Sequence, residues 1–192
     1  MSRHSAPCSS SLTEVTAYST LEPRSDATNI LTNPHSGRLI QRGTFRFRTL
    51  EESKSLAFWL AHSYPDPERA TYGLHELFTN AIEHGNLDIG YQLKSILIEE
   101  HRWDKEIAHR LNDERYAHRY VEVIFVHDDE GVHVSIIDQG KGFAWDSYLT
   151  IDPMRMADLH GRGIAVAALM SFDRITYHGL GNHVTTFVHV PK

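Results

Sequence analysis

The segment from His75 to Asn86 constrains this chain more than any other part of the sequence. Glu76 and Asn80 are four residues apart, so a helix would place a carboxylate and a carboxamide on one face, with His84 one turn further along. A carboxylate beside a hard oxygen ligand suits magnesium-dependent phosphoryl transfer, although many helices also carry Glu and Asn on a solvated face. The apolar residues recur at helical spacing, at Leu74, Leu77, Phe78, Ala81 and Ile82.

Two glycine-containing motifs follow this segment. Residues 132–143 are strand-like and end in the pattern Asp-x-Gly-x-Gly, which begins at Asp138. Residues 160–165 contain a Gly-x-Gly pattern at the start of an apolar helix. Glycines let the backbone approach a ligand closely, and the free N–H groups at a helix start attract phosphate. Each glycine pair alone also fits an ordinary turn, but the three motifs in this order indicate a nucleotide site.

The ordered set resembles the N, G1 and G2 boxes of the GHKL (Bergerat-fold) ATP-binding superfamily. Within it, the sequence of residues 76–86 is similar to the N box of the anti-sigma-factor serine kinases of RsbW type. The resemblance covers roughly residues 39–190. It implies an α+β fold, a two-layer sandwich in which helices cover one face of a mixed, mostly antiparallel sheet.

The resemblance also implies a role for each motif. Asn80 would coordinate Mg²⁺, and Glu76 would be the general base toward an acceptor hydroxyl, or would orient a water in simple hydrolysis. Asp138 would accept a hydrogen bond from the adenine amino group of ATP. His84 would lie near the phosphates, hold Asn80 in place, or only cap the helix. The residues expected to bind the cofactor are Asn80, His84, Asp138, Gly140, Gly142, Phe143, Gly161, Arg162 and Gly163. Within this set, Gly140 and Gly142 would wrap the base, and residues 161–163 would meet the phosphates.

The rest of the sequence divides into a polar tail and one domain. Residues 1–38, rich in Ser, Thr, Pro and Asn, are expected to be a flexible tail, and residues 39–192 an ATP-binding domain. Thr49 and Glu52 form a capping-box pattern for a helix that runs to about Ala61. Strands are expected within 39–49 and at 120–126, 132–138, 174–178 and 184–190, with helices at 68–84 and 163–171 and a helical insertion of one or two helices at about 87–119.

Composition favours a soluble cytoplasmic protein and excludes several other classes. Acidic residues outnumber basic ones, 25 to 19, and the formal charge of −6 argues against a general nucleic-acid binder. The single cysteine, Cys8, cannot form a disulfide within one chain. No apolar run approaches the length of a membrane span, and the N-terminus has no signal-peptide pattern. No two of the 14 histidines are four residues apart, which argues against a helical zinc site.

Two functions from different classes remain. The first is an ATP- and magnesium-dependent protein serine/threonine kinase that acts as an anti-sigma factor, with an anti-anti-sigma (STAS-domain) substrate and a sigma factor as second partner. The second is an ATP-binding regulatory module without kinase activity, which would control a phosphatase or response regulator by binding. Only about 38 polar residues precede the first strand, which argues against the phosphoacceptor hairpin of a sensor histidine kinase. The segment between Phe143 and His160, where the resemblance expects an ATP lid, is unusually apolar, and the insertion leaves a homodimer open.

Overall fold

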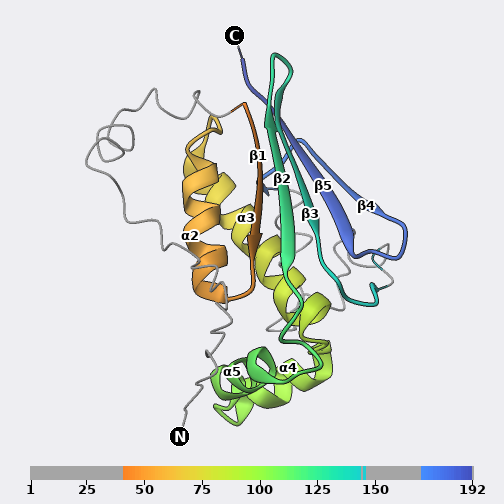
Figure 1. Ribbon diagram of the computed structural model, residues 1–192. Coiled ribbons are helices and arrows are strands. Elements are labelled where there is room, and N and C mark those ends of the chain that lie inside the picture. The colour runs from red at the N-terminus through yellow and green to blue at the C-terminus, as the bar shows by residue number, and fades with distance from the viewer. Residues whose placement is uncertain (1–40, 144, 146–169, 192) are drawn as a thin grey trace, which may run out of the picture. The chain divides into compact units, whose positions relative to one another are not determined.

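A computed structural model describes residues 41–143, 145 and 170–191 of the chain (Figure 1). The expected tail, most of the expected ATP lid and the helix expected at 163–171, apart from its last two residues, lie outside the described residues. The strands are β1 (Arg42–Phe47), β2 (Val121–His127), β3 (Gly131–Ile137), β4 (Arg174–His178) and β5 (His183–His189). The helices are α2 (Leu50–Ala61), α3 (Pro67–Asn80), the π-helix η2 (Ala81–Asn86), α4 (Tyr91–Glu99) and α5 (Trp103–Asn112).

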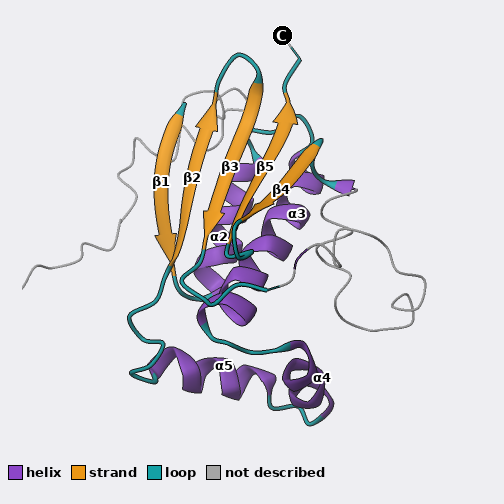
Figure 2. Ribbon diagram, turned by 90° about the vertical axis from the view of Figure 1, so that its right-hand side faces the viewer, coloured by secondary structure: helices purple, strands orange, loops and turns teal. Residues whose placement is uncertain are grey.

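The five strands form one sheet in the order β1-β2-β3-β5-β4, and α2 and α3 cover one of its faces (Figure 2). This arrangement is the predicted α+β architecture of two layers. The expectation of a mixed sheet is corrected, because every neighbouring pair of these five strands is antiparallel. The connection between β1 and β2 explains why these two strands are antiparallel. The chain leaves β1, runs up α2 and back down α3, and so returns to the end of the sheet from which it departed (Figure 1).

Alternation along the strands builds the core between the two layers. Val121, Val123 and Phe125 of β2 are fully buried, whereas the residues between them are half-buried on the other face. Strand β3 repeats the pattern, as the period of two in a strand requires. From the helical layer, the largest side chains that fill the core are Leu60, Leu74, Leu77, Phe78 and Ile82.

Local signals at the helix starts act as the sequence predicts. Thr49 Oγ1 accepts a hydrogen bond from the backbone N–H of Glu52, and the Glu52 carboxylate accepts one from the backbone N–H of Thr49. This confirms the capping box at the start of α2. Helix α3 begins with Asp66 as its cap, which accepts from the N–H of Arg69, and with Pro67 at the first position.

The predicted helix at 68–84 does not continue as an α-helix to its end. It changes at Asn80 into the π-helix η2, in which the N–H of Leu87 donates to the carbonyl of Ile82, five residues earlier. The expected boundary is therefore wrong at this end. The last residues of this π-helix, Gly85 and Asn86, contact the turn after β3.

The insertion between η2 and β2 contains two helices, where the sequence predicts one or two. Leu97 of α4 and Ile107 of α5 are buried, which joins the insertion to the main core. Arg110 donates hydrogen bonds to the carbonyl oxygens of Leu87 at 2.7 Å and Asp88 at 2.9 Å. Arg48 donates to the carbonyl oxygens of Leu111 at 2.9 Å and Arg119 at 3.2 Å. None of the described helices combines the length and the apolar character that a membrane crossing requires.

Replacing Thr49 tests the capping box. Thr49→Ala should lower the free energy of unfolding by about 1 kcal/mol, because the backbone N–H of Glu52 loses its hydroxyl acceptor. Thr71→Ala is the control, since the Thr71 hydroxyl only bonds back to the carbonyl of Pro67 within α3. Urea denaturation measures both changes. Equal stability of Thr49→Ala and wild type would contradict this reading of the helix start.

Candidate functional site

Helix α3 presents Glu76 and Asn80 on successive turns. The helix is anchored by Leu74, Leu77 and Phe78, which are buried on its other side. Glu76 and Asn80 are half-buried, and the side chain of neither makes a hydrogen bond or an ion pair with another described residue. The helix places the two residues one turn apart, as their spacing predicts.

Two titratable neighbours extend this polar strip. Burial, and after it the charge of Glu76, raises the pKa of the Tyr72 phenol one turn earlier. At the other end, Nδ1 of His84 forms a hydrogen bond with the carbonyl oxygen of Ile89. Burial lowers the pKa of His84, so the neutral imidazole is favoured. This contact with the backbone after η2 is none of the three roles that the resemblance implies for His84, which stay predictions.

Gly85 brings the helix layer into direct contact with the turn after β3. A Cβ atom at Gly85 would lie 2.4 Å from Cγ of Asp138, and one at Gly140 would lie 2.4 Å from the carbonyl oxygen of Gly85. Side chains do not approach other atoms so closely, so a side chain at Gly140 would require a shift of the Gly85 backbone, and one at Gly85 would require the Asp138 carboxyl to move. The segments that contain Gly85 and Asp138, two residues that are 53 positions apart in the sequence, thus meet at this point.

The Asp138 carboxyl is held half-buried at this contact. Its Oδ1 accepts a hydrogen bond of 2.8 Å from the N–H of Gly140. Burial raises the pKa of Asp138 to about 6, although the Gly140 N–H and the charge of Arg119 act to lower it. At neutral pH the group is therefore mainly a carboxylate that lacks a full set of hydrogen bonds, which makes it a strong acceptor for a ligand N–H.

Asn86 fixes the turn that carries Asp138. Its Oδ1 accepts from the N–H of Gln139 at 2.8 Å, and its carbonyl oxygen accepts from Arg119 at 2.9 Å. Gln139 in turn accepts from the N–H of Tyr120 at the start of β2. Nδ2 of Asn86 is buried and has no hydrogen-bond partner among residues 41–143, 145 and 170–191. The sequence contains Asn86 in the N box, but nothing local indicates that it clamps a turn 53 residues later.

Gly142 and Phe143 pack against the turn between β4 and β5. Gly142 has a positive φ of 78°, and a Cβ there would lie 2.0 Å from the carbonyl oxygen of Leu180. The N–H of Phe143 donates to that same oxygen, and the Phe143 ring meets Tyr177 edge-on at 5.5 Å. The N–H of Asp138 donates to the carbonyl of Asn182. The Asp-x-Gly-x-Gly segment therefore contacts the turn between β4 and β5 as well as the end of η2.

A buried ion pair beside the site escapes sequence reasoning altogether. Glu83 of η2 is fully buried, and its Oε2 pairs with Nζ of Lys94 from α4. Its Oε1 has no hydrogen-bond partner within the described part of the chain. The pair links the insertion to the helical turn that follows Asn80. No spacing rule could reveal it, because the partners lie on separate helices joined by a loop.

Gly161, Arg162 and Gly163 lie outside the described residues. Among the residues described, no group of three or more His, Cys, Asp or Glu side chains could hold a metal ion. Asn80 alone would be a sufficient protein ligand only for an ion that keeps most of its coordination to phosphate and water, as Mg²⁺ does. No known family model and no curated protein matches this chain.

Removing Lys94 tests the buried pair. Lys94→Met should lower the free energy of unfolding by about 3–5 kcal/mol, because Glu83 would remain buried without its counter-charge. Adding Glu83→Gln to that variant should restore a large part of the loss, since no charge is then left in the core. Thermal and urea unfolding measure both. A double variant no more stable than the single one would contradict the electrostatic explanation.

The raised pKa of Asp138 predicts a pH dependence of stability. Because its pKa is about 6 when folded and 3.8 in its ordinary state, the folded chain binds this proton more readily than the unfolded chain. The contribution of Asp138 to stability should therefore fall as pH rises through that interval. Relative to wild type, Asp138→Asn should gain roughly 1–3 kcal/mol in the free energy of unfolding between acidic and neutral pH.

Denaturation with urea at a series of pH values provides the measurement. The control is Asp129→Asn, which changes an exposed carboxylate in the turn between β2 and β3. This variant should follow wild type at each pH. A difference between Asp138→Asn and wild type that stays constant across the series would contradict the burial of the Asp138 carboxyl.

Proposed function

We propose that this chain is an ATP- and magnesium-dependent protein serine/threonine kinase of the GHKL type, which acts as an anti-sigma factor on a STAS-domain partner. The α+β sandwich is compatible with the Bergerat fold that this proposal requires. The observation that carries the proposal is the contact of Gly85 with Asp138 and Gly140. It brings the helix that bears Glu76 and Asn80 together with a strand-end carboxylate, and these are the two halves of a nucleotide site.

Asp138 would select the base of the nucleotide. Its carboxylate accepts only one hydrogen bond from a described residue, that of Gly140, and so retains capacity for the exocyclic amino group of adenine. A guanine would present a carbonyl oxygen at the equivalent place and would be repelled. Asn86 supports this role at one remove, because its hydrogen bond to Gln139 fixes the turn that holds Asp138.

Glu76 and Asn80 would serve the phosphate end of the ligand. Asn80 would hold Mg²⁺ through its carboxamide oxygen, which no described residue occupies. When bound, the ion would neutralise charge on the phosphates and hold them in place. Glu76 would take the proton from the attacking serine or threonine hydroxyl of the partner. By resemblance, Gly161, Arg162 and Gly163 would complete the phosphate contacts.

Separating binding from chemistry tests this assignment. Wild type should bind ATP saturably with Mg²⁺, and Glu76→Ala should leave that affinity nearly unchanged while phosphoryl transfer falls by roughly 10²–10⁴-fold. Asn80→Ala should instead weaken the magnesium-dependent binding itself. Glu68→Ala, in the exposed first turn of α3, is the matched control and should change neither quantity. Calorimetry measures binding, and labelled ATP with candidate STAS proteins measures transfer.

The outcomes distinguish the proposal from its neighbours. Absence of saturable ATP binding by wild type would overturn the whole assignment, and equal loss of binding in both variants would mean that α3 presents a structural face. Phosphate on a histidine of this chain would indicate a histidine kinase. ATP-dependent partner binding without any phosphate transfer would favour the non-catalytic regulatory module. Mass spectrometry of the mixed proteins identifies the acceptor residue.

A further inference from the structure

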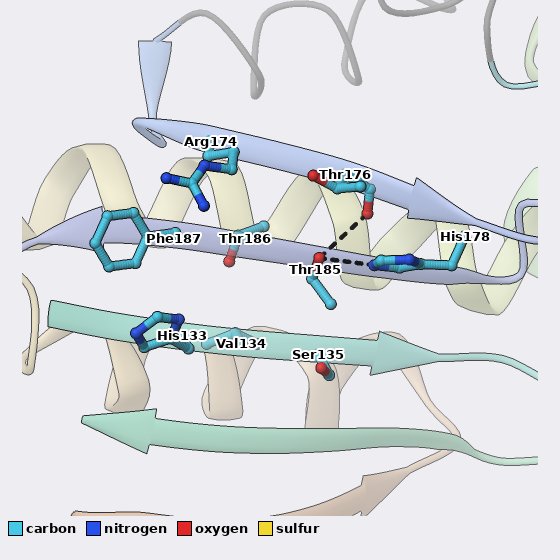
Figure 3. A pocket seen from close by; sticks show the side chains of 9 residues that line it. All are labelled: His133, Val134, Ser135, Arg174, Thr176, His178, Thr185, Thr186 and Phe187. Carbon is cyan, nitrogen blue, oxygen red and sulfur yellow. Dashed lines mark hydrogen bonds between the residues drawn. The ribbon is translucent and has the colours of Figure 1, made fainter. Parts of the chain in front are cut away.

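A polar hollow of about 290 Å³ lies on the sheet face that α2 and α3 do not cover. It is formed by the outward residues of β3, β5 and β4, which the strand register places in adjacent rows (Figure 3). One row contains His133, Phe187 and Arg174. These elements turn different residues toward the core, so the hollow shares no side chain with Glu76, Asn80 or Asp138.

Arg174 supplies a positive charge that no carboxylate of the described residues neutralises through an ion pair. Its guanidinium lies 5.3 Å from the centre of the Phe187 ring, and the His133 ring packs 4.7 Å from the same ring. Arg174 makes no hydrogen bond or ion pair with another described residue, so its N–H groups are available to a ligand. Because two neighbours already occupy Phe187, the ring offers little area to an apolar or aromatic ligand.

A row of hydroxyl groups lies directly beside this charge. Ser135 is paired with Thr185, and Thr185 with Thr176, across the three strands. Thr185 is already engaged, because its hydroxyl bonds with Nε2 of His178 at 2.9 Å and with the carbonyl of Thr176 at 3.4 Å (Figure 3). The hydroxyls of Ser135 and Thr176 have no such bond to a described residue, so both can donate to a ligand.

The nearby carboxylates are occupied elsewhere. Asp128 lies 3.6 Å from His133 and accepts from the N–H groups of Glu130 and Gly131, whereas Asp173 accepts from the N–H of His189. Neither forms an ion pair with Arg174. On a chain with a net charge of −6, the hollow therefore combines one free guanidinium, neutral hydroxyl donors and flanking imidazoles.

We propose that this hollow binds a phosphate group, either free or carried on a serine or threonine of a partner protein. A guanidinium binds two oxygens of a phosphate side by side, and the hydroxyl of Thr176, two residues further along β4 on the same face, is placed to donate to a third oxygen. A carboxylate has only two oxygens and would leave some of these donors unused. The site is separate from the proposed nucleotide site and does not depend on its function.

Site-resolved NMR on the full ¹⁵N-labelled chain tests the proposal with inorganic phosphate as the probe. Backbone amides of β4 and β5 around Arg174, Thr176 and Thr185 should shift saturably. Shifts near Asn80 or Asp138 would report the other site and can be followed independently. Arg174→Gln should raise the dissociation constant for phosphate, measured from the shifts in β4, by about 10-fold. Thr176→Val should raise it by about 3-fold, as expected for the loss of a neutral rather than a charged hydrogen bond.

Strand β1 provides matched controls on the same face of the sheet. Arg42 lies in the row of Arg174, and Thr44 in the row of Thr176, at the opposite edge. Arg42→Gln and Thr44→Val make the same chemical changes there and should leave phosphate binding unchanged. Equal weakening by Arg42→Gln would show general attraction to positive charge and would overturn the site. Absence of saturable shifts in β4 and β5 would overturn it as well.

A second titration identifies the source of the phosphate. A short peptide with one phosphoserine is compared with inorganic phosphate and with the unphosphorylated peptide. Tighter binding of the phosphopeptide than of inorganic phosphate supports a site for a phosphorylated partner, and equal or weaker binding supports one for the free ion. Equal binding of the phosphorylated and unphosphorylated peptides would contradict phosphate recognition.

Discussion

The contact between the backbones of Gly85 and Gly140 sets how closely the helical layer approaches the end of β3. A methyl group on Gly140 would separate the two segments, because it would meet backbone atoms of Gly85 that cannot rotate away, and one on Gly85 would displace the Asp138 carboxyl. The half-burial of Asp138 and the hydrogen bond from Gln139 to Asn86 both depend on this distance. The turn between β4 and β5 then joins the same assembly through Asn182 and Leu180. The end of η2, the turn after β3 and the turn between β4 and β5 thus lie close together where Gly85 and Gly140 have no side chains.

Strand β3 serves both faces of the sheet. Its inward residues, such as Val134 and Ile136, are buried under the helices, and the strand delivers Asp138 to the candidate nucleotide site. Its outward residues His133 and Ser135 line the polar hollow with β5 and β4 (Figure 3). The period of two that builds the core therefore also separates two polar environments by the thickness of one sheet.

Sequence reasoning succeeds where the determining interaction is local. The capping box of Thr49 and Glu52 lies within four residues, and the alternation of β2 and β3 is visible in seven-residue runs, so these elements follow from the sequence. The spacing of Glu76 and Asn80 likewise places them on one helix. The Asp-x-Gly-x-Gly pattern identifies Asp138 as a strand-end residue, as observed.

What the sequence does not reveal depends on distant partners. The π-helix ends at Gly85 and Asn86, which meet a turn that comes more than fifty residues later, and the contacts of these two residues are not visible in the local sequence. The same holds for the pairing of Glu83 with Lys94 and for the clamp of Arg119 on Asn86. The sequence also does not reveal that β1 and β2 are antiparallel. Their relative direction depends on two helices that pack side by side and return the chain to the end of the sheet from which it departed.

The helical insertion has a consequence for chain closure. Pairing β1 with β2 closes a long loop that contains α2, α3, η2 and the two inserted helices, and residues 87–119 make up almost half of it. The entropy of closing a flexible loop grows only with the logarithm of its length, at about 0.6 kcal/mol for each doubling. One buried contact from the insertion, such as that of Leu97 or Ile107, offsets a penalty of this size. The connection between β1 and β2 can therefore contain the two inserted helices at little cost in loop-closure entropy to the pairing of these strands.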